Sequence, residues 1–374
     1  MKRGRFWKDG MNGREKGHGY DGYDGYDGRE KAIEKIETRT FGFKWLIMLL
    51  FPPALFVATL FLGRYNVPPD QVLAILKKNL LHLPVDAWWT DSAEAVIIKV
   101  RLPRAIMAML VGAGLSMSGA SFQGMFHNPL VSPFILGVSA GASFGAAVGL
   151  VLSLPALGVQ ALAFLFGIMA VAITYFMSRI YKVTPILMLV LSGMVVSAFF
   201  QAMLSIIKFM ADGDDKLPAI TFWLMGSLGS IGPDDMAISG IPIMVSMIGL
   251  HLVRWKLNVL SMGDREARAL GVNTELIKTI IIVCATVITS TAVAFCGIIG
   301  WVGQVIPHFC RMLVGPDHKA LIPAAMLVGA TYLLLIDNFC RLFTSVEIPL
   351  GILTAVVGAP VFAYLLRKTK GGWN

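Results

Sequence analysis

The sequence has few charged residues, and long parts of it have none. Only 15% of its 374 residues are Asp, Glu, Lys or Arg, whereas 56% are hydrophobic. No charged residue occurs between Arg104 and Arg179, and the segments 183–207, 279–310 and 348–366 are also uncharged. A soluble domain carries about 25% charged residues, because its surface is exposed to water. The composition therefore excludes a soluble enzyme and predicts a polytopic integral membrane protein.

Sequence motifs for nucleotide hydrolysis and metal binding are also missing. There is no GxxxxGK[ST] phosphate loop and no HExxH pair. The four cysteines show no CxxC spacing and fall in or beside apolar segments, where packing explains them. We therefore expect no catalytic residue, no metal site and no bound cofactor in this chain.

The apolar segments do not alternate with polar residues, so they predict α-helices and not transmembrane β-strands. A membrane-spanning helix needs about 20 mostly apolar residues. Lys and Arg number 23 on the side that carries both termini and nine on the other, which predicts that both termini are cytoplasmic. The fold expected is all-α, with ten spans at 43–62, 93–117, 129–152, 157–177, 185–207, 236–253, 276–295, 298–313, 320–336 and 348–366.

The first 42 residues differ in composition from the rest. They contain 10 of the 32 basic residues and the repeat YDGYDGYDG at 20–28. Such a segment has too little apolar surface to fold by itself, and its basic residues suit contact with anionic lipid headgroups. We expect a disordered cytoplasmic tail at 1–42, a ten-helix domain at 43–367 and a short C-terminal tail at 368–374.

Two arginines lie at the predicted outer end of the second span, against the positive-inside tendency. They are Arg101 and Arg104 in the segment RLPR. One interpretation is that their side chains reach the lipid headgroups. The other is that they bind carboxylates of an external protein, since guanidinium groups pair with carboxylates in a bidentate manner. Spacing alone favours neither.

The loop 254–278 contains a short amphipathic segment, GDREARALGV at 263–272. Asp264 is a suitable N-cap, Ala267 and Leu270 are three residues apart on one face, and Gly271 suits a left-handed helix end. A helix this short is marginal by itself. We therefore expect it to rest in a groove of a partner protein. The opposite face carries Arg265, Glu266 and Arg268.

Four ordered motifs resemble one transporter family. They are RLPRAIMAMLVGAGLSMSGASFQGMFHNPLVSPFILGVSAGASFG (101–145), GDREARALGV (263–272), GWVGQVIPHFCRMLVGPDHKALIPA (300–324) and DNFCRLFTSVEIPLGILTAVVGAPVFAYLL (337–366). Together they resemble the permeases of ATP-driven iron-siderophore, haem and cobalamin importers. The sequence departs from that pattern in its long tail and at Gln304, where an apolar residue is commoner.

The resemblance implies a homodimer in the cell membrane with two cytoplasmic ATPase subunits, which use the ATP, and a substrate-binding protein outside. It implies that Arg101, Arg104 and Arg341 dock that binding protein and that 263–272 is the coupling helix seated in the ATPase. It also places Asn128 and Thr184 at the cytoplasmic gate. The residues expected along the translocation path are Ser192, Ser197 and Gln201, for which helix–helix hydrogen bonding is an equal alternative.

Alternatives to an ATP-driven iron-chelate importer stay open at this point. An ion-coupled carrier usually has an acidic residue in the middle of the membrane, but the third to tenth predicted spans contain none, and Asp337 and Glu347 lie only close to span ends. A membrane scaffold is a further class, and an oxyanion such as molybdate is a further substrate. The histidines His127, His251, His308 and His318 are isolated in the sequence and do not establish a metal or haem site. Nothing indicates nucleic-acid binding.

Overall fold

The computed structural model describes residues 24–179, 184–343 and 346–368, and in those residues every regular element is a helix. The all-α prediction is confirmed. The chain divides into two compact units, Met1–Leu46 and Ile47–Asn374. The helices are α1 (Asp24–Phe61), α2 (Pro69–Leu81), α3 (Asp91–Ala95), the π-helix η1 (Val96–Arg101), α4 (Leu102–Met125), α5 (Val138–Val151), α6 (Ala156–Ser178), α7 (Ile186–Met210), α8 (Lys216–Met225), α9 (Pro233–Leu260), α10 (Asp264–Ala269), α11 (Thr274–Cys296), α12 (Val302–Val314), α13 (His318–Leu342) and α14 (Leu350–Lys368).

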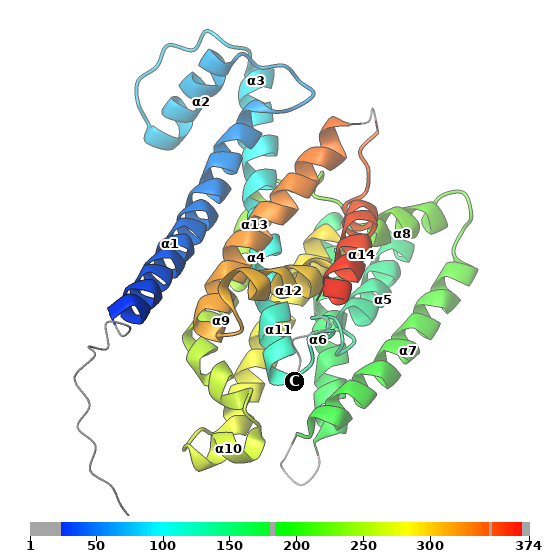
Figure 1. Ribbon diagram of the computed structural model, residues 1–374. Coiled ribbons are helices and arrows are strands. Elements are labelled where there is room, and N and C mark those ends of the chain that lie inside the picture. The colour runs from blue at the N-terminus through cyan, green and yellow to red at the C-terminus, as the bar shows by residue number, and fades with distance from the viewer. Residues whose placement is uncertain (1–23, 180–183, 344–345, 369–374) are drawn as a thin grey trace, which may run out of the picture. The chain divides into compact units, whose positions relative to one another are not determined.

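The helix α4 is the centre of the second unit (Figure 1). It packs against α9, α11, α12 and α13, and nearly all of its side chains are buried. Its sequence is rich in Ala, Gly and Ser, and small residues let neighbouring helix backbones come close. Since lipid tails are as apolar as the side chains, this close packing holds the helices together in place of a hydrophobic force.

Glycines mark the closest helix contacts. A Cβ at Gly112 of α4 would overlap the carbonyl oxygen of Gly329 in α13. In the hairpin of α5 and α6, a Cβ at Gly141 or Gly145 would likewise overlap a carbonyl oxygen of α6. The spacing of four residues, visible in the sequence, therefore corresponds to a real line of backbone contact between these two helices.

In the part of the chain that the structure describes, seven helices are long and apolar enough to cross a membrane. Three predicted spans correspond to helices outside these seven, namely α5, α12 and α14, and the first two of them begin clearly later than expected. The third, predicted at 129–152, is α5 alone, because Pro129, Pro133 and Gly137 lie in turns before it. The eighth, predicted at 298–313, is α12 of 13 residues, about 20 Å long, which begins after Gly297 and Trp301 take positive φ angles. The total of ten spans and their orientation stay predictions.

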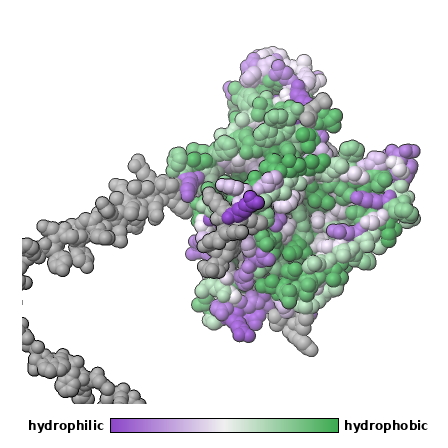
Figure 2. Space-filling view, turned by 45° about the vertical axis from the view of Figure 1, so that its right-hand side comes forward, coloured by the Kyte–Doolittle hydropathy of each residue, from purple (hydrophilic) through white to green (hydrophobic). Residues whose placement is uncertain are grey.

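The remaining differences concern helix ends and unexpected helices. The helix α1 begins at Asp24, inside the segment assigned to a tail, where REKAIEK consists mainly of strong helix formers. Residues 1–23, with the first four residues of the Tyr-Asp-Gly repeat, lie outside the described residues, as does the C-terminal tail after Lys368. The short helices α2 and α8 were not among the elements predicted from the sequence. Figure 2 shows hydrophobic side chains over most of one face, with hydrophilic ones gathered at the top and bottom.

Gly112→Ala should destabilise the protein, because the added methyl group meets backbone and not a flexible side chain. Overpacking of this kind costs about 1–3 kcal/mol. Gly240→Ala is the matched control in the interior of α9, since its Cβ would lie 3.4 Å from the end of the Leu110 side chain. The free energy of unfolding of the control should rise by up to about 1 kcal/mol, because Ala has the higher helix propensity. Thermal unfolding in detergent measures both, and equal midpoints would contradict the role of Gly112.

Candidate functional site

The expected coupling segment forms the short helix α10, which lies at the end of the second unit opposite α2 (Figure 1). Gly271 has a φ of 78°, as its place after the helix requires. Ala267 is buried against the rest of the chain, whereas Leu270 is 63% exposed. The two therefore do not form one shared face, and Leu270 is the apolar side chain that α10 offers to a partner.

A buried ion pair attaches α10 to α11. Lys278 is only 1% exposed, and its Nζ lies 2.5 Å from Oδ2 of Asp264. Asp264 is thus not the helix cap that the sequence predicted, since Gly263 holds the N-cap position without a side-chain bond. A buried cation requires a partner of opposite charge, so Lys278 makes the position of α10 depend on α11.

Glu275 in the first turn of α11 connects α10 with α7. Its Oε1 lies 3.5 Å from the Arg268 guanidinium and 3.9 Å from the Lys278 ammonium. Its Oε2 accepts a hydrogen bond of 3.1 Å from the backbone N–H of Thr184, two residues before α7 begins at Ile186. Arg268 also donates to the Thr274 hydroxyl. One carboxylate therefore contacts the expected coupling helix and the expected gate residue.

The two expected gate residues have different surroundings. Thr184 is 1% exposed. Asn128 is exposed in the turn after α4, where its Oδ1 accepts a hydrogen bond of 2.9 Å from the N–H of Leu130. The same turn is held by Gln304, whose Nε2 donates to the Leu130 carbonyl at 3.0 Å. The unusual glutamine of the sequence thus positions the segment that carries Asn128.

The three expected path residues do not lie on one face of α7. Ser192 is buried, Ser197 is half-buried and Gln201 is exposed. Ser192 and Gln201 are nine residues apart, which is two and a half helical turns, so they point in opposite directions. Burial of Ser192 suits helix packing. An exposed amide inside a span suits contact with water in a path, because hydrocarbon offers it no partner.

The three arginines expected to dock a binding protein are buried, with exposures of 4% for Arg101, 5% for Arg104 and 7% for Arg341. Arg101 donates to the backbone carbonyls of Leu60 and Tyr65. Arg341 donates to other carbonyls of the same region, those of Thr59 and Leu62, and to the Asn338 side chain. These contacts join the C-terminal ends of α1 and α13 to η1. In this conformation the two guanidinium groups bind their own chain.

Arg104 lies between two carboxylates. Its Nη2 is 2.9 Å from Oδ1 of Asp337, which is also buried, and its Nη1 is 3.0 Å from Oε1 of Glu347, whose side chain is 38% exposed. Asp337 also lies 3.8 Å from Nε of Arg341. The acidic residues nearest the predicted spans therefore compensate arginines, and Asp337 is not an isolated carboxylate of the kind that couples transport to an ion.

Two of the four histidines contact the end of α9, and neither belongs to a metal cluster in the part of the chain that the structure describes. No group of three or more His, Cys, Asp or Glu side chains suited to a metal occurs there. His127 contacts the Leu260 carbonyl at 2.8 Å, and His318 contacts the Asn258 side chain. Both contacts connect the end of α9, just before α10, to neighbouring helices.

Sequence reasoning missed Glu275 and Lys278. A visible signal existed, since Lys278 is a lone cation directly before a long uncharged run, and such a residue usually has a specific partner. Which carboxylate it would meet was not readable, because Asp264 lies in a separate helix.

Comparison with known proteins identifies the chain. The model of the FecCD transport family matches residues 48–368. The chain belongs to the FecCD transport family. The molybdate import permease MolB of Haemophilus influenzae is 40% identical over 85% of this chain and 94% of its own. A permease named for iron chelatin transport, from Helicobacter pylori strain 26695, is 41% identical over 81% and 90%.

A solved structure extends the comparison to three dimensions. It is an inward-facing metal-chelate type ABC transporter, with a TM-score of 0.76 and 37% identity over 89% of this chain and 99% of the other. The resemblance inferred from the four motifs is confirmed. This FecCD protein is a multi-pass permease subunit of an ABC importer, and it is not an enzyme.

Asp337→Ala should destabilise this permease strongly, because it leaves Arg104 buried without its buried partner. Removing one member of a buried pair costs about 3–5 kcal/mol. Glu347→Ala removes the half-exposed partner of the same arginine and should cost about 1 kcal/mol or less. Thermal unfolding of both purified variants compares them. If Asp337→Ala lowered the unfolding midpoint no more than Glu347→Ala does, the buried pair would not be important for stability.

Proposed function

We propose that this FecCD permease works as a homodimer that imports a chelated metal, an iron–siderophore complex first among the candidates, with two separate ATPase subunits bound at α10. Substrate is delivered by an external binding protein, and the termini are cytoplasmic. The observation that carries this proposal is α10 itself. It is exposed on one side, through Leu270, and connected on the other through buried charges to the start of α7.

The proposed mechanism passes movement of α10 to the path through Glu275. When the ATPase subunits close, α10 shifts with them, and its ion pairs carry the first turn of α11 along. The carboxylate of Glu275 then moves the backbone at Thr184, from which α7 follows. The exposed Gln201 on α7 is the path residue we favour among the three expected, since it can bind water or a polar chelate.

Docking of the binding protein at Arg101, Arg104 and Arg341 is a further part of the proposal. Because Asp337 and Glu347 already compensate Arg104, carboxylates of a binding protein must compete with internal partners. A carboxylate of the binding protein would replace Glu347 at Arg104 more easily than Asp337, because Glu347 is the more exposed of the two. Docking would then alter the contacts among the outer ends of η1, α13 and the segment before α14.

A second substrate class is supported by one specific comparison. The relative named for molybdate import matches as well as the one named for iron chelatin. The ligand held by the cognate binding protein distinguishes them, and uptake of radiolabelled ferric siderophore or molybdate into proteoliposomes containing the whole complex tests the result.

Leu270→Asp should weaken binding of the ATPase subunits by about tenfold or more, because it places a charge in an apolar contact of the size of a binding hot spot. Leu81→Asp, at the end of α2, is the matched control, since Leu81 is 65% exposed and Leu270 63%. Co-purification of the ATPase with each folded permease gives the readout. If the Leu270→Asp permease retained the ATPase subunits fully, the proposed contact between α10 and the ATPase would be wrong.

Glu275→Ala should separate ATP hydrolysis from transport. The complex should still assemble and hydrolyse ATP, but transport per ATP should fall, because α10 is no longer connected to Thr184. Glu275→Gln retains an acceptor for the Thr184 N–H and should recover part of the transport. Asp215→Ala, an exposed carboxylate near α8, is the control. An unchanged ratio of substrate moved to ATP hydrolysed in Glu275→Ala would contradict the relay.

A further inference from the structure

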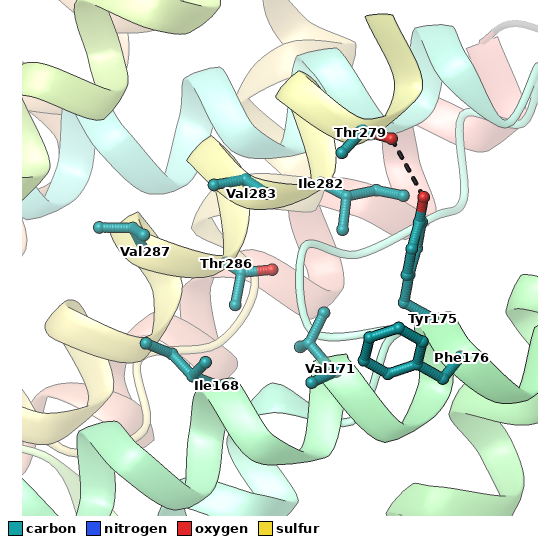
Figure 3. A pocket seen from close by; sticks show the side chains of 10 residues that line it. Ile168, Val171, Tyr175, Phe176, Thr279, Ile282, Val283, Thr286 and Val287 are labelled. Carbon is teal, nitrogen blue, oxygen red and sulfur yellow. Dashed lines mark hydrogen bonds between the residues drawn. The ribbon is translucent and has the colours of Figure 1, made fainter. Parts of the chain in front are cut away.

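A groove runs between α6 and α11 on the second unit (Figure 3). Its lining residues are spaced i, i+3, i+4, i+7 and i+8 on both helices, counted from Ile168 on α6 and from Thr279 on α11. It has a volume of ≈ 350 Å³, and apart from two threonine hydroxyls and one tyrosine hydroxyl its lining side chains are apolar. Neither the proposed coupling route nor the path uses this groove.

The length of the groove is close to the thickness of the hydrocarbon of one leaflet of a bilayer. From Thr279 to Val287 the groove follows α11 for about 12 Å, and the hydrocarbon of one leaflet is about 15 Å thick, half of about 30 Å. One end of the groove, at Tyr175 and Thr279, lies within two turns of the end of α6 and the start of α11. That end is therefore near the membrane surface, and the groove extends inward.

The inner end is closed by a close helix contact. A Cβ at Gly167 of α6 would lie 2.9 Å from the hydroxyl oxygen of Ser290 in α11. The two helices touch there and separate toward Tyr175, where a hydrogen bond of 3.2 Å between the Tyr175 and Thr279 hydroxyls spans the gap (Figure 3). A groove that is closed at depth and open toward the surface suits a chain that enters from one leaflet.

A cation lies at the open end. Arg179 directly follows α6 and is exposed, and its guanidinium carbon is 5.9 Å from the centre of the Tyr175 ring. The nearest carboxylate on α11 that faces this end, Glu275, is already bound to Arg268 and to the Thr184 N–H. Arg179 is therefore placed to bind an anion just outside the apolar groove.

We propose that this groove binds one acyl chain of an anionic phospholipid whose phosphate contacts Arg179. An acyl chain gains no hydrophobic energy by moving from bilayer to groove, because both are apolar. Retention must come from close packing and from the headgroup charge, and a basic residue near the membrane surface attracts anionic lipid. The site therefore selects phosphatidylglycerol over phosphatidylcholine.

The test is native mass spectrometry of the delipidated whole complex, titrated separately with these two lipids. We expect one phosphatidylglycerol per permease chain, bound about fivefold more tightly than phosphatidylcholine. Arg179→Gln should abolish the preference but not the binding. Equal affinities for the two lipids in the wild type, or an unchanged preference in Arg179→Gln, would overturn the headgroup assignment.

Filling the groove tests the acyl-chain site. Ala172→Trp from α6 and Val283→Trp from α11 should each remove the tight lipid, and the second variant serves if the first does not fold. Ala161→Trp is the control, because Ala161 lines another mostly apolar groove on α6, about 16 Å along the helix from Ala172. Retention of the tight lipid by both groove variants, or its equal loss in Ala161→Trp, would overturn the proposal.

Discussion

The structure depends on one constraint, which is that a charge removed from water must be compensated within the chain. Among the described residues, the buried charges Arg104, Asp337, Arg341 and Lys278 lie near groups of opposite charge, whereas the buried Arg101 donates to two backbone carbonyls instead. At one end Arg104 is held by Asp337 and Glu347. At the other, Lys278 is held by Asp264 and Glu275. Each pair joins elements that are distant in the sequence, so compensation of charge also determines which helix ends move together.

Between these two ends, close packing holds the helices together. Close backbone contacts at glycines, as between Gly112 and Gly329, need no charge and give no preferred direction of movement. Rigid packing in the middle with ionic connections at the ends suits a transporter that must rearrange. The groove beside α6 also follows from this packing, because it forms where α6 and α11 separate after their close contact at Gly167.

Several residues had a different role in the structure from the one the sequence indicated. Arg101 and Arg104 were notable because they contradict the positive-inside tendency, and their burial with internal partners accounts for that placement. Asp264 was expected as a cap and instead compensates a buried lysine. Ser192, Ser197 and Gln201 were grouped by polarity, although helical geometry directs them to different faces. In each case the surroundings of the side chain were not readable from the sequence.

The sequence by itself determined the class of the protein, the positions of most apolar helices and the short amphipathic helix within 263–272. Those properties follow from hydropathy, from loop charge and from motifs that are continuous along the chain. Only the tertiary structure decided that Glu275 meets Thr184, that Arg104 meets Asp337, and where α5 and α12 begin. The physical reason is that burial and charge compensation depend on contacts between segments up to 282 residues apart, and one sequence without the fold does not say which segments become neighbours.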